Sequence, residues 1–90
     1  MATKKFVNGF ESWRDTFYEI TQVITDELLK PKTESKIINE RHEREGTPAM
    51  WELATELADK FEMLNKGRVW DGEFYDEVEA FAKEELFKEN

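Results

Sequence analysis

The sequence predicts an all-α protein, a compact bundle of three long helices with one shorter polar helix. Apolar residues recur at spacings of three and four along three segments, which is the period of a helix buried on one face. The links between segments are about two to five residues long, which favours antiparallel neighbours. Ninety residues make one domain, so we expect residues 1–90 to fold together, with 1–8 as a flexible N-terminal arm.

The first helix is expected over about residues 10–29. Asn8 is placed to cap its N-terminus, and Pro31 ends it because the residue before a proline is pushed out of helical geometry. The apolar stripe that should face the core consists of Phe10, Trp13, Phe17, Ile20, Ile24 and Leu28.

A shorter helix is expected over about residues 33–45, with Thr33 or Ser35 as its N-cap and Gly46 as its stop. Ile37 and Ile38 are its only large apolar residues. So polar a segment should lie across the bundle or be partly detached from it.

The third helix is expected over about residues 48–66, with Thr47 as N-cap and Pro48 at the first helical position. Its stripe is wide, which is typical of a helix that contacts two neighbours, so we expect it to lie centrally. The stripe consists of Met50, Leu53, Leu57, Phe61 and Leu64, widened by Trp51, Ala54 and Ala58.

The fourth helix is expected over about residues 72–88. Gly67 closes the preceding helix, Asp71 is the predicted N-cap, and Trp70 is placed to pack against Tyr75 as a hydrophobic staple. The core stripe continues as Phe74, Val78, Phe81, Ala82 and Leu86.

The net charge of -8 restricts the partners of this chain. Such a surface repels nucleic acid and anionic lipid, so we expect no direct nucleic-acid or membrane binding and a protein partner with a neutral or basic surface. The chain has no cysteine, which excludes disulfides and thiolate metal sites. No apolar run resembles a secretory signal or a membrane span, so we expect a cytoplasmic protein. The charge surplus favours a soluble monomer or at most a weak homodimer.

No residue pattern predicts catalysis, a metal site or a cofactor. His42 is the only histidine, and a metalloprotease motif beginning there would need a second one where Gly46 stands. The many carboxylates recur in i,i+4 pairs with Lys or Arg, which is typical of solvent-facing helices. We therefore expect a non-enzymatic protein, while a small carboxylate-dependent enzyme remains a second alternative.

The leading hypothesis is a protein–protein interaction or accessory module. Several apolar residues fall on polar faces or on stripe margins, and together they could form a partner-binding surface: Tyr18, Val23, Trp51, Met63 and Phe87. The first alternative is a DNA-mimicking inhibitor of a nucleic-acid-binding protein. It rests on the acidic excess of the first and last segments, where residues 10–29 hold five acids and one base, and residues 68–90 hold eight and three.

Overall fold

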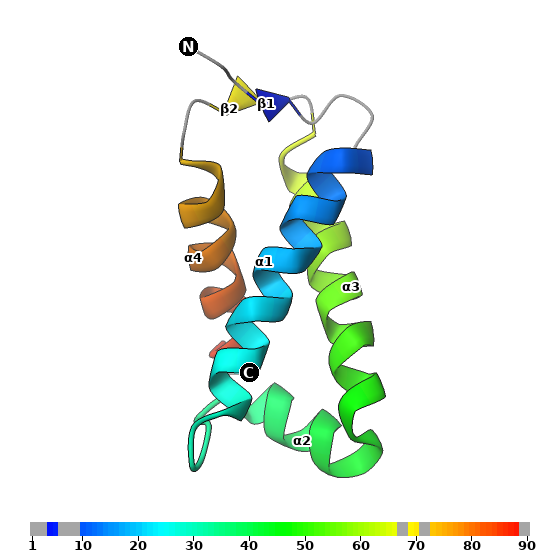
Figure 1. The fold of residues 1–90 in the computed structure, drawn as a ribbon, viewed down its shortest axis with the longest axis vertical. Helices are drawn as coiled ribbons and strands as arrows, with labels where there is room; N and C mark the ends of the chain where they lie inside the picture. Colours follow the sequence, from blue (N-terminus) through cyan, green and yellow to red (C-terminus); the bar gives the residue numbers. More distant parts are fainter. Residues whose placement is uncertain (1–3, 6–9, 67–68, 71–72, 89–90) are drawn as a thin grey trace.

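The computed structural model describes residues 4–5, 10–66, 69–70 and 73–88. Within this part of the chain it has four helices, which confirms the predicted all-α fold. They are α1 (Phe10–Leu28), α2 (Lys36–Glu45), α3 (Thr47–Leu64) and α4 (Phe74–Leu86). In Figure 1, α1, α3 and α4 run along the long axis of the molecule, and α2 crosses the lower end.

A short antiparallel pair of strands, which the sequence did not predict, lies at the opposite end from α2 (Figure 1). β1 (Lys4–Lys5) pairs with β2 (Val69–Trp70), with Lys4 opposite Trp70. Two residues are too few to show the alternation by which a strand is read from sequence. The rest of the expected N-terminal arm lies outside the described residues, as do the predicted caps Asn8 and Asp71 and the Trp70 side chain of the predicted staple.

α1 buries a face that overlaps its predicted apolar stripe but is shifted from it. Ile20 and Ile24 lie in the core as expected, but Val23 is also buried, at 5% exposure, whereas Leu28 is 37% exposed. The reason is that α1 packs against both α3 and α4. Val23 lies one turn before Glu27, whose carboxylate interacts with the charge of Lys83 in α4. The prediction that Val23 projects from a polar face and is available to a partner is therefore wrong.

The core draws on all four helices, and α3 contributes the largest share, as expected for a central helix. Phe61 of α3 makes edge-to-face contacts with Phe74 and Phe81 of α4, with ring centroids 6.2 Å and 5.2 Å apart. The buried apolar residues are Ile20, Val23, Ile24, Ile38, Ala49, Met50, Leu53, Ala54, Leu57, Ala58, Phe61, Phe74, Val78, Ala82 and Leu86.

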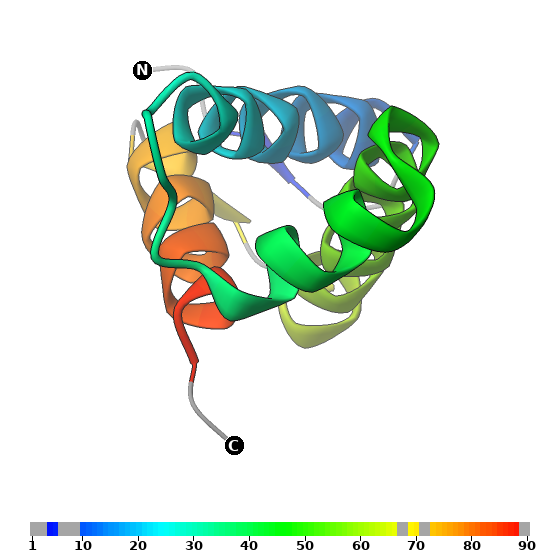
Figure 2. The ribbon, with the colours of Figure 1, turned by 90° about the horizontal axis from the view of Figure 1, so that it is seen from below.

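α2 is docked across the end of the bundle rather than detached (Figure 2). Ser35 is its N-cap: the hydroxyl accepts a hydrogen bond from the Ile38 amide at 3.3 Å and donates one to the Leu86 carbonyl at 2.6 Å. This second bond ties the start of α2 to the end of α4. Ile38 is fully buried.

Gly46 makes the turn from α2 into α3 alone, serving as C-cap of the first and N-cap of the second. Its φ of 75° lies in the left-handed region that glycine adopts without strain. Thr47 is therefore the first residue of α3 and not its cap, which corrects the prediction. At the start of α4 the N-cap is Glu73 and not the predicted Asp71, because the helix begins later than expected, at Phe74.

A buried polar contact fastens the end of α1 to the link that follows it. Glu27 is only 6% exposed, and its carboxylate accepts hydrogen bonds from the Thr33 hydroxyl at 2.6 Å and the Lys30 ammonium at 2.7 Å. The bond from Lys30, followed by that from Thr33, lowers the pKa of Glu27 below its ordinary value of 4.5. Folding is thus favoured by the charged form of this carboxyl.

We expect the contribution of Glu27 to stability to depend on pH. Because its pKa is lower in the folded protein, the contribution is complete above the unfolded pKa and disappears as the pH falls through the folded pKa. At pH 7, Glu27→Gln should lower the free energy of unfolding by about 1 kcal/mol, since bonds to a charged acceptor are stronger than bonds to a neutral one. Urea denaturation at several pH values between about 7 and 3 should show that the difference in unfolding free energy between wild type and Glu27→Gln becomes smaller as the pH falls. A difference that stays constant would contradict the proposed role of the charge.

Candidate functional site

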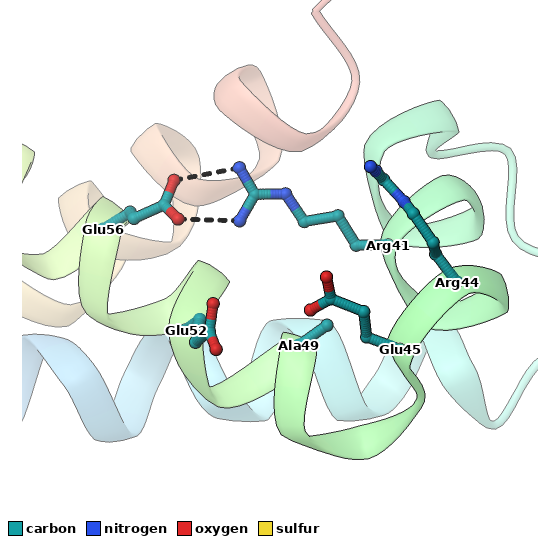
Figure 3. A pocket seen from close by; sticks show the side chains of 6 residues that line it. All are labelled: Arg41, Arg44, Glu45, Ala49, Glu52 and Glu56. Carbon is teal, nitrogen blue, oxygen red and sulfur yellow. Dashed lines mark hydrogen bonds and ion pairs between the residues drawn. The ribbon is translucent and has the colours of Figure 1, made fainter.

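A charged pocket lies where α2 meets α3 (Figure 3), with a volume of about 260 Å³. The Arg41 guanidinium donates two hydrogen bonds to the Glu56 carboxylate, at 2.7 Å and 3.0 Å. These bonds raise the pKa of Arg41 and lower that of Glu56. The residues that line the pocket are Arg41, Arg44, Glu45, Ala49, Glu52 and Glu56.

The charged groups of this pocket hold two helices together, α2 through Arg41 and α3 through Glu56. A bidentate arginine–carboxylate pair fixes the orientation of both side chains as well as their separation. Glu45 and Glu52 lie on the same side of the pocket, below the guanidinium in Figure 3, and their charges further raise the pKa of Arg41. The main cation of the pocket is therefore already neutralised by the protein itself, and we assign this pocket to the docking of α2.

A different surface, on the seam between α1 and α3, carries the largest concentration of accessible aromatic rings among the described residues. We define the aromatic surface as Trp13, Phe17, Tyr18 and Trp51. Phe17 lies between two stacked neighbours, with its ring centroid 5.1 Å from that of Trp13 and 5.8 Å from that of Trp51. Tyr18 tilts against Phe17 at 6.1 Å. Trp51 is 52% exposed and Tyr18 61%, so the cluster is open to solvent.

Two carboxylates of α3 lie beside the aromatic surface. Asp59 accepts a hydrogen bond from the Trp13 indole N–H at 2.6 Å, which fixes that ring. Glu62, three residues further along, has one oxygen, Oε2, that is enclosed and has no hydrogen-bond partner. Burial and then the charge of Asp59 raise the pKa of Glu62, and the charge of Lys66 offsets part of this rise. The seam therefore combines exposed π faces with an incompletely satisfied carboxylate.

The structure brings together only two of the five residues predicted to bind a partner. Tyr18 and Trp51 meet through Phe17, which contacts both rings. Met63 and Phe87 are exposed, but Met63 is in the last turn of α3 and Phe87 follows α4, at opposite ends of the bundle (Figure 1). Val23 is buried, as described above.

Sequence reasoning assigned Trp13 and Phe17 to the core stripe of α1, and so did not include them in the candidate surface. Both are only partly buried, because they pack against the edge of the core rather than within it. Their spacing of four residues was a usable signal, since aromatic side chains one turn apart on a helix lie next to each other.

A cluster of acids lies between α1 and α4. Burial raises the pKa of Glu19, and the charges of Glu79, Asp26 and Asp76 raise it further. Lys83 offsets part of this charge through an ion pair with Glu79 at 3.3 Å. Across the described part of the chain, histidine and carboxylate side chains do not gather in groups of three or more that could hold a metal ion.

Within the described ranges, each helix is too short or too polar to cross a lipid bilayer. Comparison of the chain with protein-family models, with curated proteins and with solved structures found no match.

Proposed function

We propose that this chain is a non-enzymatic protein–protein interaction module that binds its partner through the aromatic surface, with Trp51 as the main contact. The observation that carries this proposal is the state of Trp51: one face of its ring is stacked against Phe17, yet half of the side chain is exposed. A large apolar ring is thereby held in place without being buried.

The physical argument is that a fixed aromatic ring loses little conformational entropy when a partner covers it. Trp and Tyr are enriched among the residues that dominate binding energy at interfaces. Trp and Tyr side chains such as those of Trp51 and Tyr18 each combine an apolar ring with one polar group, which suits a surface that is hydrated when free and covered when bound.

The test is capture of partners from a lysate of the source organism by tagged wild type, Trp51→Ala and Met63→Ala. Met63 is the matched control because it lies on the same helix and is more exposed, at 81%, but outside the aromatic surface. We expect Trp51→Ala to weaken capture of a specific partner by about 30-fold or more, the effect of a hot-spot residue, and Met63→Ala to leave it unchanged. Equal capture by all three proteins would overturn the proposal.

The second candidate function is DNA mimicry, and the acid cluster between α1 and α4 favours it. Glu19 on α1 lies close enough to Asp76 and Glu79 on α4, and to Asp26 on its own helix, for their charges to interact with its own. A partner recognised in this way would be a nucleic-acid-binding protein, captured at about 50 mM salt and lost at about 500 mM, because screening weakens contacts between exposed charges. Its capture would also be competed by DNA and would be insensitive to Trp51→Ala.

A further inference from the structure

The chemistry of the partner can be narrowed from the groups beside the aromatic surface, on the premise that the proposed function is correct. Trp51 is about half exposed (52%) while its ring stacks on Phe17, so part of its π system is open to a partner. The face of an indole carries partial negative charge and attracts Lys and Arg more strongly than the other aromatic side chains do. The exposed part of the surface is thus suited to a cation as well as to apolar atoms.

The carboxylates on the same side of α3 point to the same chemistry. Trp51, Asp59 and Glu62 are spaced by eight and three residues, which places them along one side of the helix. Glu62 Oε2 lacks a hydrogen-bond donor, although the charge of Lys66 lowers the pKa of Glu62 and so offsets part of the effect of burial and of Asp59. Glu56, Glu79 and Glu85, in comparison, each form a direct ion pair with a basic side chain of the protein itself.

We infer that the partner segment is cationic, with one Lys or Arg over the exposed part of the Trp51 ring and a second at the carboxylates of Asp59 and Glu62. Trp51 and Asp59 are separated by about 12 Å along the helix axis, at a rise of 1.5 Å per residue. An extended peptide spans this distance in about four residues. The segment therefore carries two basic residues about four positions apart in an extended stretch.

The overall charge of -8 attracts this segment from a distance, and the local groups select it on contact. Attraction by net charge alone would also bring cationic peptides to the protein. The experiment must therefore separate the carboxylates of this surface from carboxylates elsewhere.

The probe is decalysine, with decaglutamate as the peptide of opposite charge, and binding is followed by NMR of the indole N–H signals and by calorimetry. Four proteins are compared: wild type, Trp51→Ala, the double variant Asp59→Asn/Glu62→Gln, and the double variant Glu43→Gln/Glu84→Gln. The two double variants remove the same charge, but Glu43 and Glu84 are exposed on α2 and α4. Asn at position 59 keeps an oxygen that can accept the Trp13 bond, and circular dichroism verifies that each variant is folded.

We expect decalysine to shift the Trp51 indole signal and decaglutamate to leave it unchanged. Trp51→Ala should weaken decalysine binding about fivefold, and Asp59→Asn/Glu62→Gln about tenfold. The charge-matched control should weaken it less than about twofold, because exposed distant charges are screened.

If the two double variants weakened decalysine binding equally, the peptide would be responding only to the net charge of the protein. That result would overturn the inference. If decalysine did not bind, and capture of a partner were still lost in Trp51→Ala, the inference of a cationic partner segment would be overturned. The proposed function would stand. Capture that is unchanged in Trp51→Ala would overturn the proposed function itself, whatever the peptide does.

Discussion

Phe61→Ala is expected to lower the free energy of unfolding by about 3–5 kcal/mol, the usual cost of removing a buried phenylalanine. Phe61 is 3% exposed and is the α3 residue whose ring meets two aromatic rings of α4. Its removal would leave a cavity at the α3–α4 contact that the surrounding rings could only partly fill. Since domains of this size are stable by about 5–15 kcal/mol, the variant should lose a large fraction of its stability and unfold at a clearly lower urea concentration.

The measurement is urea denaturation followed by circular dichroism, with Leu64→Ala as control. Leu64 lies one turn after Phe61 on the same helix and is exposed. Its substitution should change stability by less than about 0.5 kcal/mol, as surface changes usually do. If the two variants were equally stable, the α3–α4 contact would not depend on Phe61, and the central position of α3 in the core would be contradicted.

The helices of this protein could be predicted from the sequence because each has a local signal. The buried residues of α3 follow its apolar stripe closely, from Met50 through Phe61. Leu64 fits the stripe and is nevertheless exposed, because it lies in the last turn of the helix. A periodic pattern gives the face that a helix buries but not how far along the helix its neighbours extend.

The buried polar groups could not be predicted, because their partners are distant or non-periodic. Ser35 reaches the Leu86 carbonyl, 51 residues away in the chain, and Glu27 is satisfied by Lys30 and Thr33 in a link without regular structure. An analysis of helical periodicity assigns polar residues such as these to the solvent-exposed face. This is also why the buried face of α1 differs from its predicted stripe: part of that face is polar.

The aromatic surface was predicted only in part, for a related reason. Trp13 and Phe17 have the spacing of core residues, and Trp51 lies at a stripe margin. Whether an aromatic residue at such a position is covered depends on the width of the contact between α1 and α3, which the sequence does not encode locally. The stacking of Phe17 on both tryptophans is visible only once the two helices are packed.

Ile38→Ala should have the second largest effect on stability, and the expected loss is about 2–5 kcal/mol. Ile38 is the buried residue of α2 and is fully enclosed, so it should contribute more to the docking of that helix than the bonds of Ser35 or the exposed Arg41–Glu56 pair. Ile37, the adjacent residue, is only partly buried, so Ile37→Ala should cost clearly less and serves as the matched control.

Two measurements together locate the effect of Ile38→Ala. Urea denaturation gives the total loss, and hydrogen exchange under native conditions gives the opening free energy of each helix. If α2 is held mainly by Ile38, the α2 amides should lose protection more than those of α3, because α2 can undock while the α1–α3–α4 contacts persist. Equal loss of protection in all helices would mean that α2 unfolds only with the rest of the bundle. Equal costs for the two isoleucines would contradict the leading contribution of Ile38 to the docking of α2.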